Sequence, residues 1–171
     1  IPTATTYQLT VTSTTGGTIT APASSPVTVN SGVATTITAV ATVGYTFAGW
    51  TVVTGSATIA TPSALSTTAT LTSGDAAVRA NFTLNTYTIT ASAVTNGTLT
   101  PTGVTTVNYG GSQTYTITPA ANYHIVSVTT DTGLVTTVIP SGMTHTFSGV
   151  EANHTISATF AIDTYQLTVS S

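Results

Sequence analysis

The side chains that could carry out acid–base or metal chemistry are few in this sequence. They are three histidines and four acids: His124, His145, His154, Asp75, Asp131, Glu151 and Asp163. A zinc site needs three or four ligands that converge at about 2.0–2.3 Å from the metal. No two of the histidines stand two or four residues apart, and the chain has no cysteine. We therefore expect no metal site, and we expect the histidines to be exposed residues of turns.

Combinations of residues that could form a catalytic site are also few. Asp131, His154 and a serine could be drawn as a hydrolase triad, but no serine lies in the Gly-x-Ser-x-Gly elbow that presents such a nucleophile. Glycosidic cleavage needs two carboxyl groups about 5–10 Å apart, and four acids spread over the whole chain do not favour such a pair. A calcium ion takes about six to eight oxygen ligands, whereas Asp75 and Asp131 are isolated in the sequence. The sequence therefore predicts a protein that is not an enzyme and holds no cofactor.

The composition favours a folded β-sheet protein. Charged residues make up 3% of the 171 residues and hydrophobic residues 40%, whereas disordered chains are rich in charge and poor in apolar residues. Threonine supplies most of the polarity, and its β-branched side chain suits a pleated surface and resists the helix. We expect an all-β fold.

The charge balance excludes two classes of partner. The formal net charge is -3, and Arg79 is the only basic residue. Nucleic-acid binding and attraction to anionic membrane surfaces both depend on several Lys and Arg side chains. No apolar run approaches the ~20 residues that span a bilayer. We expect neither nucleic-acid binding nor membrane insertion.

One pattern occurs three times along the chain. The segment TYQLTV at residues 6–11 returns as TYTITA at 86–91 and as TYQLTV at 164–169. Other segments match in the same order: residues 27–30 match 105–108, and residues 36–39 match 115–118. The three segments begin about 80 residues apart. This spacing is longer than the ~20–50 residues of most solenoid repeats and is typical of small domains in tandem. We divide the chain into an extension (1–6), two modules (7–84 and 85–162) and a repeated first strand (163–171).

Within each module, short alternating segments are separated by Gly, Asn and Pro turns. Tyr7, Leu9 and Val11 alternate with polar residues, which is typical of a half-buried strand. No segment carries the apolar spacing of an amphipathic helix, and the best place for a single helical turn is Thr61 to Leu65. The predicted fold is two tandem modules, sandwich-like or β-grasp-like, followed by a terminal β-strand.

Five segments carry a family resemblance: TYTITASAVTNGTLTPTG, TVNYGGSQTYTITPAANYHIVSV, HTFSGVEANHTISATFAIDTY, GYTFAGW and TSGDAAVRANF. They resemble the divergent internalin-type B repeats of bacterial surface proteins, and the resemblance extends from about Tyr7 to the end of the chain. It implies small β-rich modules strung on secreted or wall-attached proteins as spacers, stalks or adhesive surfaces. It also implies an extracellular or cell-surface location and no catalytic motif. The Lys and Asp residues usual in such repeats are nearly missing here.

Two kinds of residue could contact or carry glycans. Sequons for glycosylation begin at Asn81, Asn96 and Asn153, and such sites permit surface glycans. Trp50 and Tyr45 could form an aromatic glycan-binding platform. We favour Trp50 as a core residue instead, which requires a bulge at Gly49 to turn its side chain inward.

The terminal segment favours self-assembly. Edge strands are normally protected by Lys, Pro or inward-pointing charge, and this chain has no Lys and few charged residues. We expect the strand Tyr165, Gln166, Leu167, Thr168 and Val169 to complete or extend a sheet of another copy, which would propagate head to tail as an open filament. The predicted function is a structural subunit of a cell-surface fibre or stalk, with itself or neighbouring repeats as partners. The alternative is an adhesin or glycan-binding module.

Overall fold

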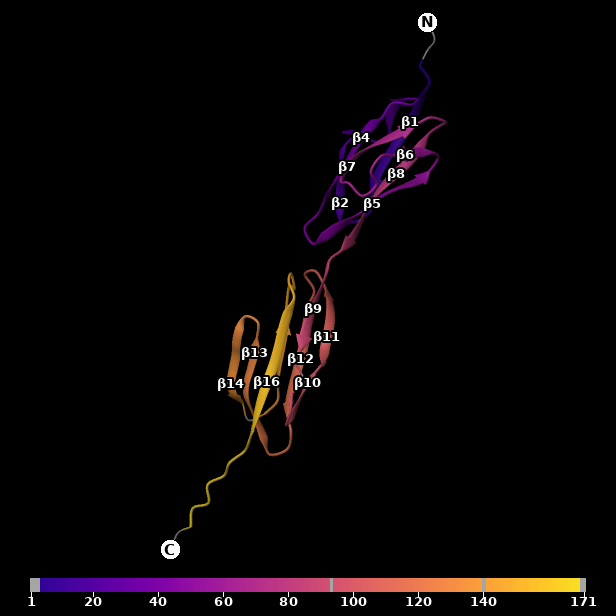
Figure 1. The fold of residues 1–171 in the computed structure, drawn as a ribbon. Coiled ribbons are helices and arrows are strands. Elements are labelled where there is room, and N and C mark those ends of the chain that lie inside the picture. Colours follow the sequence, from indigo (N-terminus) through magenta and orange to yellow (C-terminus); the bar gives the residue numbers. More distant parts are fainter. Residues whose placement is uncertain (1–3, 93, 140, 170–171) are drawn as a thin grey trace. The chain divides into compact units, whose positions relative to one another are not determined.

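A computed structural model describes residues 4–92, 94–139 and 141–169. The chain divides into two compact units, of which the first ends at Asn85 and the second begins at Thr86. We call them repeat 1 and repeat 2. Both consist of β-strands joined by turns, and the described residues contain no helix (Figure 1). The predicted all-β fold with two tandem modules is confirmed.

Repeat 1 contains eight strands: β1 (Thr6–Ser13), β2 (Gly17–Ala21), β3 (Val27–Asn30), β4 (Thr35–Ala41), β5 (Tyr45–Thr54), β6 (Ala57–Ile59), β7 (Ser66–Leu71) and β8 (Ala76–Leu84). They form two four-stranded sheets with the orders β3-β1-β8-β5 and β2-β4-β7-β6. The first and last strands, β1 and β8, lie side by side and parallel. The other neighbouring strands are antiparallel.

Repeat 2 has the same number of strands: β9 (Thr86–Ala91), β10 (Gly97–Thr100), β11 (Gly103–Asn108), β12 (Gln113–Pro119), β13 (Tyr123–Thr130), β14 (Gly133–Ile139), β15 (Met143–Phe147) and β16 (His154–Ile162). Its sheets have the orders β11-β9-β16-β13-β14 and β10-β12-β15. The first and last strands, β9 and β16, again pair in parallel. The repeated sequence pattern therefore reflects a repeated topology.

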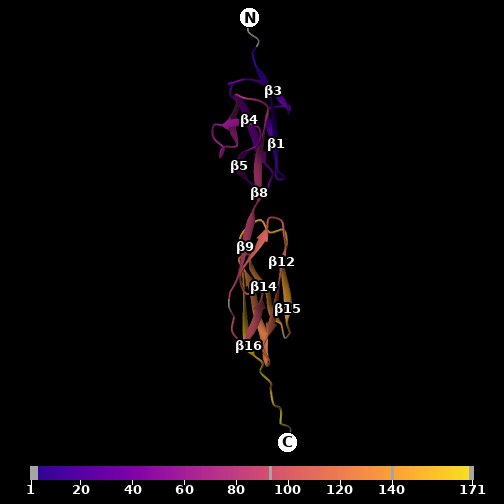
Figure 2. The same ribbon diagram turned by 90° about the vertical axis from the view of Figure 1, so that its right-hand side faces the viewer.

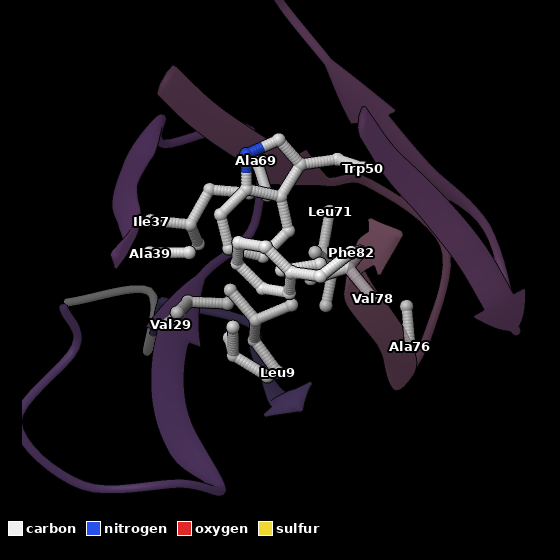
Figure 3. Packing of buried hydrophobic residues seen from close by; sticks show 12 residues of the cluster. Leu9, Val29, Ile37, Ala39, Trp50, Ala69, Leu71, Ala76, Val78 and Phe82 are labelled. Atoms are coloured by element: carbon white, nitrogen blue, oxygen red, sulfur yellow. The ribbon is translucent and has the colours of Figure 1, made fainter. Parts of the chain in front are cut away.

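Each repeat buries one core between its two sheets. Of the two predicted architectures, sandwich-like and β-grasp-like, the repeats therefore have the sandwich. Side chains from both sheets of repeat 1 point into the same space (Figure 3). In β8, Ala76, Val78, Ala80 and Phe82 are all buried, because alternate residues of a strand face the same side. A β-grasp fold would require a helix that covers a sheet, and the described residues contain none.

The core of repeat 2 corrects one detail of the sequence comparison. Tyr115 and Ile117 are fully buried on β12, and Ile37 and Ala39 are the buried residues of the equivalent strand, β4. Matching residues 36–39 to 115–118 is therefore wrong by one position. Both segments alternate between threonine and apolar residues, so they can be aligned in two registers that differ by one residue. The shifted register exchanges the buried and the exposed positions.

The repeats differ in where the sixth strand pairs. In repeat 1, β6 pairs with the outer edge of β7, with Ala57 opposite Leu71 and Ile59 opposite Ala69. In repeat 2, β14 pairs instead with β13 and so belongs to the other sheet (Figure 1). In repeat 1 the outer edge of the seventh strand, β7, is consequently covered by β6. In repeat 2 the seventh strand, β15, is the last strand of its sheet, and no described strand covers its outer edge.

The predicted helical turn at residues 61–65 is wrong. This segment is a turn in which the Ala64 N–H donates to the Thr61 carbonyl oxygen (3.1 Å). Its next carbonyl, that of Pro62, accepts a hydrogen bond from the Trp50 N–H (2.8 Å). Because the Pro62 carbonyl is bonded to β5, the loop covers part of the edge of β5 that corresponds to the edge of β13 paired with β14 in repeat 2.

Candidate interaction site

The residue after the last strand of repeat 2 is bound to the start of the fifth strand. The Asp163 N–H donates to the Asn122 carbonyl oxygen (2.8 Å), and the Asp163 Oδ1 lies 2.9 Å from the His124 Nδ1. Both side chains are partly buried. This pair of contacts anchors the chain at the point where it leaves repeat 2.

The same anchor exists in repeat 1 with different chemistry. The Asn85 N–H donates to the Gly44 carbonyl oxygen (2.8 Å), and the Thr46 hydroxyl donates to the Asn85 Oδ1 (2.6 Å). Asn85 and Asp163 occupy equivalent positions, each directly before the TY pair that begins the next copy of the pattern. In each repeat, the residue directly before the following segment is therefore held in place by hydrogen bonds.

The segment beyond this anchor is exposed. Residues 164–169 form no strand, and the exposed fractions of Tyr165, Leu167 and Val169 are 85%, 89% and 81%. Residues 164–169 are therefore not paired as a strand with any described residue, and their role as the first strand of a third repeat or as a donor strand stays a prediction. The physical reason is pairing, because a strand needs a neighbour and the described residues provide none here. A shallow cavity of about 380 Å³ lies at the start of the segment, lined by His124, Val138, Asp163, Thr164 and Tyr165.

The equivalent segments of repeats 1 and 2 show what this sequence does when it has neighbours. Strand β1, whose residues 6–11 are identical to residues 164–169, lies between β3 and β8. There Leu9 is 0% exposed and Val11 is 3% exposed. The Gln8 N–H donates to the Asp75 Oδ1 (2.8 Å). The free segment thus has the residues of a buried strand.

That position is already occupied in both repeats. If residues 164–169 of one copy replaced β1 of another, Leu167 would become buried and Leu9 would become exposed. The apolar area removed from water would not change, so such an exchange gains no hydrophobic free energy. A net gain requires an edge where the segment adds to a sheet without displacing a strand.

The histidines do not lie in exposed turns. His124, His145 and His154 are in strands β13, β15 and β16 and are half-buried, so the expectation of turn positions is wrong. The rings of His145 and His154 lie 4.8 and 5.0 Å from that of Phe147. These contacts give the histidines a packing role that their spacing in the sequence did not indicate.

Asp131 and His154 form the second pairing of an acid with a histidine. The Thr155 N–H donates to the Asp131 Oδ1 (3.0 Å) and lowers the pKa of the Asp131 carboxyl below its usual value. His154, with its Nδ1 3.0 Å from the Asp131 Oδ2, lowers this pKa further. Within the described parts of the chain, no three His, Asp or Glu side chains are grouped as metal ligands.

The sequon asparagines differ in how free their side chains are. Glycans attach to the amide nitrogen, and the Asn81 Nδ2 donates to the Gly49 carbonyl oxygen (3.0 Å) and to the Thr51 Oγ1 (3.1 Å). A glycan on Asn81 would replace one of the two amide hydrogens, so at least one of these contacts would be lost. Asn153 is exposed, and its Oδ1 accepts the Thr88 N–H (2.9 Å). Asn96 is exposed in the turn before β10.

The aromatic residues proposed as a glycan platform are largely covered. Trp50 is 4% exposed, and its Nε1 donates to the Ala64 carbonyl oxygen (3.0 Å). The register of β5 against β8 shifts between Phe47 and Gly49, so the bulge turns Trp50 toward the core beside Phe47. Tyr45 is half-buried with its ring packed on Gly16. The buried ring of Trp50 offers no open face to a sugar.

The comparison with known families gives two matches in sequence. The model of the divergent InlB B-repeat domain matches residues 7–86 and residues 87–164. The chain belongs to this family. The matched segments coincide with repeats 1 and 2, so each β-sandwich described above is one InlB-type B repeat. Residues 165–169 lie beyond the second match and begin the pattern again.

Membership of the divergent InlB B-repeat family supports the coarser predictions. This family consists of structural repeats that are typically extracellular or surface-attached, and it is not known for catalysis. No curated protein and no solved structure matches the chain. No helix among the described residues is long and apolar enough to cross a membrane.

Proposed function

We propose that this protein is a non-catalytic subunit of an extracellular fibre or stalk, in which copies join through pairing of β-strands. The observation that supports the proposal is the segment Tyr165–Val169. It has the sequence of a buried strand, it has no partner among the described residues, and three of its five side chains are exposed apolar groups. A segment of this kind gains free energy wherever a sheet accepts it.

Burial of these side chains would contribute to holding copies together. Burying a leucine or valine side chain contributes roughly 1.5–3 kcal/mol, and each 1.4 kcal/mol changes a dissociation constant about tenfold. The joint connects the end of one copy to a different surface on the next. A contact of that type is heterologous, and repeated contacts produce an open chain of subunits.

The surface chemistry is compatible with such pairing. The described strands carry a single basic side chain, that of Arg79, so charge does little to protect the exposed edges. Exposed threonines keep these edges in solution and favour a pleated conformation. Glycan binding, the alternative function, has no support from the buried position of Trp50.

The test compares Leu167→Asp with Thr168→Asp by light scattering over a range of protein concentrations. Both residues are exposed and lie outside the sandwiches, so neither change affects the fold of a repeat. We expect the parent chain to gain mass with concentration. Leu167→Asp puts a charge on the apolar face of the segment and should weaken assembly more than about tenfold. Thr168→Asp puts the same charge on the opposite face and should assemble nearly as the parent does.

Two outcomes would contradict the proposal. The parent chain could remain monodisperse at every concentration, as expected for a tandem array that does not associate. Alternatively, the two variants could assemble equally, which would show that the apolar face of the segment is not buried.

A further inference from the structure

The outer edge of β15 is an unfilled position in the sandwich of repeat 2. In repeat 1 the equivalent edge, on β7, is paired with β6, whose Ala57 and Ile59 pack on the core. In repeat 2 the corresponding strand β14 pairs with β13. Met143–Phe147 is bonded only to β12 among the described residues, and it lies at the margin of the repeat in Figure 2.

The residues of β15 indicate which side chains a strand would need in order to pair with its open edge. Met143, His145 and Phe147 are on the inner side, where the first two are half-buried. Thr144 and Thr146 are on the outer side and exposed. A strand added here needs apolar residues at alternate positions to cover the inner side and polar, uncharged residues between them. Strand β6 of repeat 1 has this pattern, with Thr58 between Ala57 and Ile59.

We infer that β15 of one copy accepts Tyr165–Val169 of a second copy as an antiparallel strand. This inference rests on the proposed function and names the acceptor that it requires. The two segments are of equal length, and the antiparallel direction is that of the β6–β7 pair. With Leu167 opposite His145, Tyr165 lies opposite Phe147 and Val169 lies opposite Met143.

This register places the apolar residues of the donor beside Met143, His145 and Phe147 on the inner side, and its polar residues beside threonines on the outer side. The apolar residues of the donor extend the inner face, where aromatic and apolar cross-strand pairs are favourable. The polar residues Gln166 and Thr168 lie opposite Thr146 and Thr144, respectively. They extend an outer face on which Thr114 and Thr146 already share a hydrogen bond (2.8 Å). No Asp, Glu, Lys or Arg side chain is placed in the pair, so none of these is desolvated without a partner.

The other end of the same sheet is a poorer acceptor. Strand β10 forms that edge, with Thr98 and Thr100 exposed on its outer face. Pro101 follows directly and cannot donate a backbone hydrogen bond, and proline commonly protects an edge from pairing. The strand β10 therefore provides a matched control with the same residue type.

Disulfide trapping between two single-cysteine variants tests the inference, because the natural chain contains no cysteine. Thr168→Cys is mixed with Thr144→Cys, and oxidised mixed dimers are counted by mass. Directly opposed residues of antiparallel strands have Cα atoms about 4.5–5.5 Å apart, which is within the range that a disulfide can bridge. We expect mixed dimers to form at least about tenfold faster than with Thr168→Cys and Thr100→Cys, the β10 control.

Three further results are decisive. Equal trapping at Thr144 and Thr100 would overturn the acceptor site, although assembly in light scattering would leave the proposed function standing. Faster trapping between Thr144→Cys and Thr146→Cys would show that β15 pairs with β15 of a second copy and would also overturn it. Faster trapping of Gln166→Cys with Thr28→Cys would show exchange with β1, whose Gln8 side chain contacts Thr28, and would refute it as well.

Discussion

Replacing Trp50 with alanine should lower the free energy of unfolding of repeat 1 by about 3–5 kcal/mol, the usual cost of removing a buried aromatic side chain. Trp50 is 4% exposed, and its ring contacts that of Phe47 (6.1 Å between centroids). The change also leaves the Ala64 carbonyl oxygen without its indole donor, so the loop over β5 loses an attachment. Differential scanning calorimetry should show the transition of repeat 1 at a lower temperature.

A matched change in repeat 2 provides the control for Trp50. Tyr115 is fully buried in the other core, so Tyr115→Ala should destabilise repeat 2 by a similar amount. Because the chain divides into two units with separate cores, each variant should shift one transition and leave the other. A Trp50→Ala protein with both transitions unchanged would contradict the burial of the indole.

Gly55→Ala should be the most damaging small change in a turn of repeat 1. Gly55 has a φ of 72°, where residues with a Cβ are disfavoured by about 1–2 kcal/mol. An added Cβ would also overlap the carbonyl oxygen of Asp75 and lie 2.8 Å from the Cα of Ala76. Both are backbone atoms at the start of β8, so no side-chain rotation can relieve the overlap. Chemical denaturation should show a loss clearly larger than the conformational cost alone.

Gly32 isolates that conformational cost. Its φ is 76°, nearly that of Gly55, but an added Cβ would meet no atom within 4 Å. Gly32→Ala should therefore cost only the disfavoured backbone conformation, about 1–2 kcal/mol. If the two variants lost equal stability, the close approach of Gly55 to β8 would be refuted.

Much of the fold was predictable because its determinants are local. The alternation of Tyr7, Leu9 and Val11 predicted a strand with one buried face, and the recurrence of TY segments predicted the two repeats. Gly49 also carried information, since the bulge that turns Trp50 inward needs a residue that tolerates a φ of 117°.

The pairing of the sixth strand could not be predicted in this way. Alternation shows which side of a strand faces the core, but it does not show which of two sheet edges the strand joins. Residues 57–59 and 133–139 follow equivalent strands and pair in different sheets. The open edge of β15 is a consequence of that choice, so the acceptor site was invisible in the sequence.

The anchor at the exit of each repeat was missed for a different reason. His124 was considered as a metal ligand and not as a partner of Asp163. Its counterpart in repeat 1 is Thr46, which contacts Asn85. The change of both positions together, from Thr and Asn to His and Asp, is a signal that comparison of the two repeats could have detected.

The identity of the terminal segment was predictable, whereas its conformation was not. Residues 164–169 match 6–11 letter for letter, but a strand forms only where another strand offers hydrogen bonds. Among the described residues the segment has no such neighbour, and it is exposed. Its conformation therefore depends on whether a neighbouring strand is present.

Hydrogen exchange at the backbone amides of Tyr165–Val169, measured at several protein concentrations, tests this dependence directly. In dilute solution these amides should exchange at the rate of an unstructured peptide, since the described part of the chain offers them no acceptor. At concentrations where light scattering shows assembly, they should become protected, because a strand in a neighbouring sheet has its amides bonded. Fast exchange of these five residues within assembled material would contradict the account, because the copies would then be joined elsewhere.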